Sequence, residues 1–258
     1  MRLMKRILSA AAVLALSASL LVGCSSGTAS SVPVSASSAA ESTVSSVEET
    51  ASSAVDENEA AAAQLLNDLT GSYQELWPVI LADEYKQTWL DDCTALVGED
   101  NAEAAFEKLF SMVTGDGYGE DAVKAYANGG GAYFCGFTNS LAILTFDGET
   151  STISGTDKDG NVLFSHTYHY IGMEPVRGLY EFQSDDADSG EFTYFFLAPD
   201  TSAETYHIEF RYGSDAEALS QYDTGEYAYW LASGISTDCD QTMIDNCIEL
   251  FCTENLAG

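Results

Sequence analysis

The chain has 258 residues, which is enough for a single domain with a full hydrophobic core as well as flanking segments. Its 41 acidic residues outnumber nine Lys and Arg residues and give a formal net charge of −32 at pH 7. This charge repels nucleic acid and anionic lipid headgroups and attracts cations non-specifically, so we expect no nucleic-acid partner.

Residues 1–23 have the parts of a bacterial lipoprotein signal peptide. Arg2, Lys5 and Arg6 form a basic start, and the apolar stretch that follows is too short for a membrane span of about 20 apolar residues. The Leu-Val-Gly that precedes Cys24 resembles the lipobox, in which small residues stand before the cysteine that takes the lipid. We therefore expect a lipid anchor on Cys24, in the cell membrane, and an extracytoplasmic protein at the cell surface. An ordinary secretory signal with an incidental cysteine is the alternative.

Residues 24–60 are expected to form a disordered tether. They are mainly Ser, Ala, Thr, Val and Glu, with one proline, no aromatic residue and no histidine. Such a segment cannot bury enough apolar surface to offset its chain entropy. The rest of the chain, residues 61–258, is expected to form one domain.

The pattern from about residue 60 to 128 is mainly helical. Residues 101–113 repeat apolar side chains at helical spacing and predict a helix with one apolar face. That face consists of Ala105, Leu109, Met112 and Val113. A second short helix is expected from Gly119, and the three glycines after Asn128 indicate a stop. They are not a phosphate-binding loop, because no Gly-Lys-Ser/Thr follows.

From residue 132 to 212 the pattern changes to short strands at hairpin spacing, separated by turn residues such as Asp147-Gly148. The seven candidate strands are residues 132–137, 141–146, 151–156, 161–170, 178–183, 191–198 and 205–212. Two helical segments, 215–221 and 239–251, end the chain. The expected fold class is mainly β with flanking helices (α+β): a closed or nearly closed antiparallel barrel preceded by helices.

Besides Cys24 the chain has an odd number of cysteines, so at least one thiol stays unpaired within a monomer. These cysteines are Cys93, Cys135, Cys239, Cys247 and Cys252. The absence of a CxxC motif gives no support to a zinc-ribbon or thioredoxin-like protein. Cys247 and Cys252 are five residues apart on an expected helix and point to different faces, so we expect no bond between them. Buried thiols are the expectation for most of the set.

Three stretches, residues 71–78, 177–182 and 195–213, resemble the ZinT (YodA) family of zinc-binding domains. They are the Gly-Ser-Tyr-Gln-Glu-Leu-Trp-Pro run, the Arg-Gly-Leu-Tyr-Glu-Phe strand, and the pair of strands around Phe-Phe-Leu-Ala-Pro and His-Ile-Glu-Phe-Arg-Tyr-Gly. The resemblance extends from about Leu69 to the C-terminus. It implies a calycin-like fold, that is, a lipocalin-type barrel with helices on its N-terminal side.

The resemblance also implies a zinc site. The family's histidine before the proline and its His-x-His pair correspond, without gaps, to Phe195, His207 and Glu209. One histidine is kept, one is replaced by a carboxylate that still binds metal, and one is lost. Zinc should then bind more weakly than at a three-histidine site, and Phe195→His should tighten it. An alternative alignment pairs Thr205 and His207 with the two histidines and needs a two-residue bulge.

Residues two apart on a strand point to the same face about 7 Å apart, so His207 and Glu209 can share one Zn²⁺ ion, which we expect inside the barrel. Zinc normally needs three or four ligands. His166 and His169 lie on one strand at odd separation, so they face opposite sides and at most one faces inward. His169 is the expected third ligand, with His166 and Glu181 as alternatives.

These features favour a metal-binding lipoprotein that scavenges a divalent transition metal, zinc above all, or delivers it to a metal-uptake ABC transporter. The alternative is a calycin-type module that holds a small apolar ligand and whose metal site has degenerated. In that case His207 is a hydrogen-bonded barrel residue, and Glu209 is solvated or pairs with Arg211. No nucleophile elbow, HExxH motif or Ser/His/Asp grouping is present, so we expect no enzyme activity.

Overall fold

The computed structural model describes residues 57–113, 134–199 and 207–256. The signal peptide, Cys24, most of the expected tether, and the expected short helix from Gly119 with its glycine run lie outside the described residues. Within the described ranges no helix is long and apolar enough to cross a membrane.

The end of the expected tether differs from the prediction, because residues 57–68 form a helix. The Ala and Glu residues of this segment favour a helix, and Ala62, Leu65 and Leu66 are buried in the barrel core. Gly148 lies in the turn beneath this helix, where an added Cβ would come within 2.4 Å of Asn67 Cα. The helical part of the domain therefore starts before residue 61.

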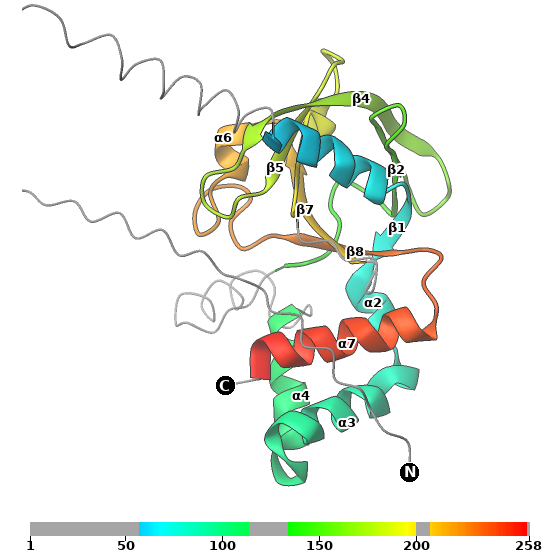
Figure 1. The fold of residues 1–258 in the computed structure, drawn as a ribbon, viewed down its shortest axis with the longest axis vertical. Helices are drawn as coiled ribbons and strands as arrows, with labels where there is room; N and C mark the ends of the chain where they lie inside the picture. The colour runs from blue at the N-terminus through cyan, green and yellow to red at the C-terminus, as the bar shows by residue number, and fades with distance from the viewer. Residues whose placement is uncertain (1–56, 114–133, 200–206, 257–258) are drawn as a thin grey trace, which may run out of the picture. The chain divides into compact units, whose positions relative to one another are not determined.

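Antiparallel strands form a closed barrel in which each strand pairs with the next and the last pairs with the first (Figure 1). Within the described residues the strands are β1 (Gly71–Glu75), β2 (Ile143–Asp147), β3 (Thr152–Thr156), β4 (Val162–Met173), β5 (Tyr180–Ser184), β6 (Tyr194–Leu197), β7 (His207–Gly213) and β8 (Ala232–Ser236). The closed antiparallel barrel with flanking helices confirms the predicted fold class.

Three details of the strand prediction are wrong. The described part of the candidate strand 132–137 forms only an isolated bridge, between Phe134 and Trp230. Strand β1 lies in the region expected to be helical, because its five residues, with only Tyr73 buried, give a weak strand pattern. Strand β8 was not predicted, because the small residues of its Ala-Ser-Gly-Ile-Ser sequence are buried on both faces and so do not alternate.

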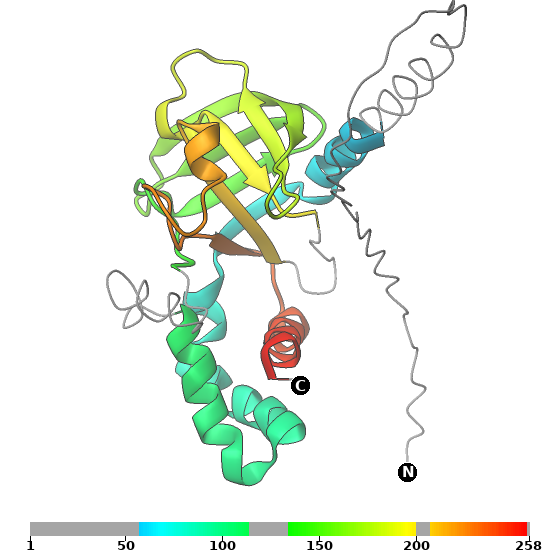
Figure 2. The same ribbon diagram turned by 90° about the vertical axis from the view of Figure 1, so that its left-hand side faces the viewer.

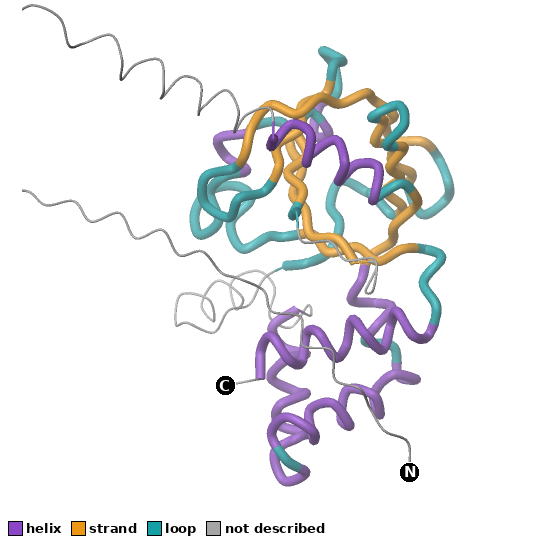
Figure 3. Tube along the Cα trace, in the orientation of Figure 1, coloured by secondary structure: helices purple, strands orange, loops and turns teal. Residues whose placement is uncertain are grey.

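Most of the helices form a layer beside one end of the barrel, as Figures 2 and 3 show. The α-helices of this layer are α2 (Leu76–Ile80), α3 (Lys86–Val97), α4 (Glu99–Val113) and α7 (Gln241–Leu256). The short elements η1 (Asp83–Tyr85), η3 (Gly190–Phe192) and α6 (Ala216–Leu219) complete the described part of the chain. The predicted apolar face of α4 is confirmed at Ala105, Leu109 and Val113, which are buried, whereas Met112 is half-buried.

The inside of the barrel is filled by aromatic side chains. Phe195 stacks on Tyr212 with ring centroids 5.4 Å apart, and Phe210 stacks on Tyr212 at 5.8 Å. Phe195 also contacts Phe164 at 5.8 Å and Tyr168 at 5.4 Å. Each of these rings is buried. Such pairs stabilise a core beyond the area that they bury.

The thiols lie mainly in the helical layer, and four of the five described cysteines are buried, as predicted. Cys93 on α3 and Cys252 on α7 face each other with their Sγ atoms 4.0 Å apart, well beyond the length of a disulfide. Cys252 is a free thiol and is therefore not bonded to Cys247, which confirms that prediction.

Candidate metal centre between β7 and α7

The side chains of β7 alternate between the barrel core and the helical layer. Those that face the core are Ile208, Phe210 and Tyr212. His207 and Glu209 lie on the other face, where both line a pocket with residues of α2 and α7. The prediction that His207 and Glu209 share a face is therefore confirmed. The expectation that this face is the inside of the barrel is wrong, because the apolar row of β7 occupies the interior.

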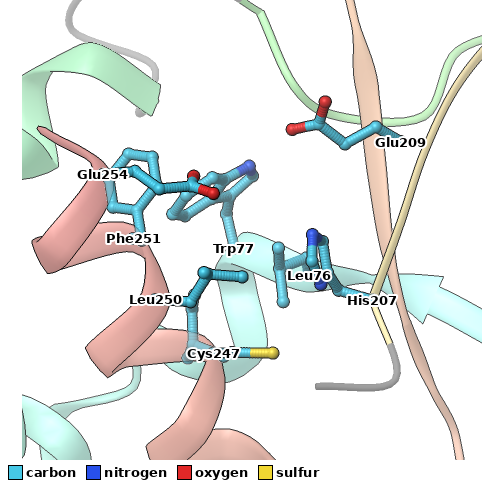
Figure 4. A pocket seen from close by; sticks show the side chains of 9 residues that line it. Leu76, Trp77, His207, Glu209, Cys247, Leu250, Phe251 and Glu254 are labelled. Carbon is cyan, nitrogen blue, oxygen red and sulfur yellow. The ribbon is translucent and has the colours of Figure 1, made fainter. Parts of the chain in front are cut away.

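The pocket is closed by α2 on one side and by α7 on the other (Figure 4). Its lining consists of Leu76, Trp77, Ile80, His207, Glu209, Cys247, Leu250, Phe251 and Glu254. Its free volume is about 30 Å³. A space of that size holds an ion or a few waters but is far below the several hundred Å³ of an organic ligand pocket.

Glu254 brings a second carboxylate to this pocket. Figure 4 shows the carboxylate of Glu209 on one side of the Trp77 ring, the carboxylate of Glu254 on the other, and the imidazole of His207 beside Leu76. Glu254 is exposed and stands where the pocket opens. The sequence analysis missed it. The available signal was helical spacing, since Glu254 follows Cys247 by seven residues and so lies on the same face of α7.

The donor set fits zinc in type and is incomplete in geometry. Imidazole nitrogen and carboxylate oxygen are both ligands that zinc accepts. Within the described ranges, however, no group of three or more His, Cys, Asp and Glu side chains is placed to hold a metal ion as it stands. His207 and Glu209 are thus two donors of the types that zinc accepts, and Glu254 is a third such side chain that lines the same pocket.

Trp77 forms the wall between these groups. Its ring meets that of Phe251 edge-on, with centroids 4.7 Å apart, which fixes the indole. The Nε1 atom is buried, and the thiol of Cys135 lies beside it. Burial, and next the charge of Glu209, raise the pKa of Cys135 to about 12, so this thiol is neutral near pH 7.

His169 does not reach this pocket, contrary to the prediction. It lies on the outer surface of β4, which β5 and β6 separate from β7, and its Nδ1 atom is 2.7 Å from Asp185 Oδ1. His166 faces the other side of β4, as its odd separation from His169 predicted. Its Nδ1 atom is 2.7 Å from Asp186 Oδ2, and its ring stacks on Phe164. Each of these histidines therefore has a carboxylate partner of its own.

Phe195 and Glu181 are not part of the pocket either. Phe195 is buried inside the barrel and pairs with Phe182 on β5, on the face opposite to His207 and Glu209. The prediction that position 195 lies at the metal site with His207 and Glu209 is therefore wrong. Glu181 pairs with Phe196 instead, and burial, followed by the charge of Glu174, raises its pKa.

Arg211 lies on the outward face of β7, and its side chain contacts the loop that follows this strand. Its buried guanidinium donates hydrogen bonds to the backbone carbonyls of Leu219, Gln221 and Tyr227. It also stacks over the ring of Tyr222 at 4.3 Å. These contacts tie the loop between β7 and β8 to the barrel wall.

The fold is a calycin-like closed barrel, and His207 and Glu209 line a small pocket between its outer wall and the helices α2 and α7. No family model and no curated protein sequence matches the chain. Among solved structures it is similar to the Zn(II)-bound ZinT-like domain of Streptococcus pneumoniae AdcA, with 15% identity and a TM-score of 0.45 over 71% of this chain and 89% of that domain. It is also similar to Zn(II)-bound AdcA from the same organism, with 15% identity and a TM-score of 0.42. That match covers 72% of this chain and 35% of AdcA. The first of these structures carries the family name that the sequence resemblance suggested.

Proposed function

We propose that this protein binds a divalent transition metal, zinc in the first place, in the pocket between β7 and α7. The observation that supports this proposal is that His207, Glu209 and Glu254 line one small pocket (Figure 4). When bound, the metal would be held by His207 and Glu209, with Glu254 joining them from α7. The role is one of binding rather than catalysis.

The size of the pocket and the packing of the barrel favour this proposal over an apolar ligand held inside the barrel. The inward positions around Phe195 and Phe210 are occupied by stacked, fully buried rings. The pocket at His207, in contrast, offers charged donors and room for an ion.

The cellular role proposed for this site is scavenging of the metal or its delivery to a metal-uptake ABC transporter, by a protein anchored through a lipid on Cys24. The basic and apolar parts of residues 1–23 and the lipobox-like Leu-Val-Gly before Cys24 support the anchor. The anchor is tested by Cys24→Ser. We expect the variant to be soluble or unprocessed, whereas a correctly cleaved variant that still fractionates with membranes would contradict it.

Calorimetric titration with zinc at about 0.15 M salt, where exposed charges are largely screened, tests the site. Wild type should bind one zinc ion, and His207→Ala should lose this stoichiometric binding. His169→Ala is the matched control, because it removes an exposed imidazole away from the pocket and should bind zinc as wild type does. Equal zinc stoichiometry and affinity in wild type and His207→Ala would refute the proposal.

The carboxylates and the pH dependence sharpen this test. Glu209→Gln and Glu254→Gln should each weaken zinc binding, with the larger loss at Glu209 because it already stands beside His207. Imidazole binds metal only when neutral, so affinity should fall as the pH drops through the ordinary histidine range near ~6.5. Binding that does not change with pH in this range would argue against an imidazole ligand.

A further inference from the structure

A second pocket lies apart from the metal centre and shares no residue with it. It has a free volume of about 460 Å³, which is the size of a site for a small organic molecule. Its lining consists of Phe134, Thr138, Asn139, Glu191, Glu226, Tyr227, Ala228 and Trp230. The residues come from the segment after residue 134, from η3 and from the loop before β8.

The wall of this pocket is aromatic and fixed in place. Trp230 is buried, donates from Nε1 to the carbonyl of Gly136 at 2.9 Å, and meets Tyr212 edge-on at 5.0 Å. Tyr227 is also buried and lies 5.9 Å from Trp230, with the two rings tilted by 33°. Rings held in this way lose little side-chain freedom on binding, which preorganises a site.

The charge of the pocket is negative. Glu191 and Glu226 line it, and no lining residue is Lys, Arg or His. Both glutamates are exposed, and Glu191 accepts hydrogen bonds from the hydroxyls of Tyr227 and Ser214. Neither carboxylate forms an ion pair with a basic residue in the part of the chain that the structure describes. A ligand that carries positive charge therefore meets two carboxylates here.

The backbone around the pocket is unusual as well. Asn139, which lines it, has φ of 55°, and Tyr229, between two lining residues, has φ of 57°. The left-handed region is rare for a bulky residue such as Tyr229. Its conformation is held by hydrogen bonds of 2.8 Å to the carbonyl of Tyr222 and 2.7 Å from the amide of Phe134. Strain that the surroundings maintain is commonly found at binding sites.

We propose that this pocket binds a small organic cation, a quaternary ammonium group or a protonated amine. A cation is attracted both by the faces of Trp and Tyr rings and by carboxylates, and an organic cation sheds its weakly held water more readily than a metal ion does. Trp230 and Tyr227 would contact the cationic group, and Glu226 and Glu191 would supply the compensating charge. The site is independent of zinc.

Choline is the probe, and its neutral isostere 3,3-dimethylbutan-1-ol is the matched ligand. Titration of the full-length protein at about 0.15 M salt should show one saturable site for choline, and binding of the isostere at least about tenfold weaker, because it lacks the charge. Glu226→Gln should weaken choline binding several-fold. Glu217→Gln, which removes an exposed charge on α6 outside the pocket, should not.

Trp230→Phe and His207→Ala separate this site from the fold and from the metal centre. Trp230→Phe should weaken choline binding and leave zinc binding intact, and His207→Ala should do the reverse. The proposal is overturned if choline does not saturate, if the neutral isostere binds equally well, or if Glu226→Gln and Glu217→Gln have the same effect. Because Glu226 is exposed, its substitution tests the proposal even if Trp230→Phe does not fold.

Discussion

On the inward face of β7, Phe210 and Tyr212 stack against other rings of the barrel core, and on its outward face His207, Glu209 and Arg211 contact helices and loops. The two faces belong to one strand and alternate residue by residue. The inward face stabilises the barrel through packing, and the described side chains around Phe195 and Phe210 are stacked and fully buried. The outward face carries polar groups, because the elements that cover it leave a small pocket. The polar pair His207 and Glu209 therefore lies on the outer wall of the barrel.

The largest effect on stability is expected at Arg211, an outward residue of β7 whose side chain is fully buried. Arg211→Ala would leave the carbonyls of Leu219, Gln221 and Tyr227 without their charged donor. We expect a loss of about 3–5 kcal/mol in the free energy of unfolding, measured with denaturant. Arg177→Ala, an exposed arginine that also stacks on Tyr222, is the control and should lose much less. Equal losses would show that burial of the guanidinium is not what matters.

The substitution Phe195→His tests most directly whether the inward and outward faces of the barrel wall have separate roles. The imidazole would replace a fully buried ring inside the barrel, at a cost of about 2–4 kcal/mol. Zinc affinity should not change, because position 195 faces away from His207. The loss should grow as the pH falls below about 6.5, because the unfolded chain then binds a proton that the buried imidazole does not. Tighter zinc binding by Phe195→His would place the metal inside the barrel and contradict this account.

The rates at which Cys239 and Cys247 are alkylated show whether α7 remains packed over the outward face of β7. Burial raises the pKa of Cys247 to about 12, and it also raises the pKa of Cys239, which is half-buried. Alkylation of the native protein, followed by digestion and mass spectrometry, should modify Cys239 first and Cys247 only after local opening. Zinc should slow the modification of Cys247 several-fold, because that residue lines the metal pocket. Fast modification of Cys247 with zinc bound would mean that α7 does not close the pocket.

The smallest effect is expected at the hairpin turn between β3 and β4, which lies on neither face of β7. Hydrogen bonds from Asn161 hold the pKa of Asp157 below its usual value. A lowered pKa in the folded state means that Asp157 stabilises the protein above the pKa of the unfolded chain. That contribution is lost as the pH falls through the folded value. Asp157→Ala should therefore be slightly less stable than wild type at pH 6, and the difference should shrink as the solution becomes acidic, with zinc binding unchanged. A difference that persists in acid would show another cause.

Most strands of the barrel can be predicted from the alternation of apolar and polar residues in the sequence. The exceptions have physical reasons. Strands such as β4 and β7 alternate clearly, because one face of each is apolar. Strand β8 cannot be predicted from alternation, because its small residues are buried on both faces and so show no alternating pattern. Strand β1 is short and runs directly into α2, so its residues read as the start of a helix.

The sequence predicts that His207 and Glu209 lie on one face of a strand. It does not predict correctly that this face is the outer wall of the barrel. A period of two sets His207 and Glu209 on one face, and the same period sets Ile208 and Phe210 on the other. The apolar side chains of Ile208 and Phe210 already indicated which face of the strand is interior. The resemblance to the family nevertheless led to the expectation that the metal site lies inside the barrel. Helical spacing places Glu254 on the same face of α7 as Cys247, but only the folded structure shows that this face lines the pocket.

The most direct measurement is an anomalous difference map, recorded at the zinc edge, from crystals of the protein grown with zinc. The account predicts one strong peak between β7 and α7, within about 2.0–2.2 Å of a nitrogen of His207 and an oxygen of Glu209. Glu254 should be turned towards the ion. A peak inside the barrel near Phe195, or stoichiometric zinc bound elsewhere, would contradict the claim that the outer wall of this barrel carries the metal site.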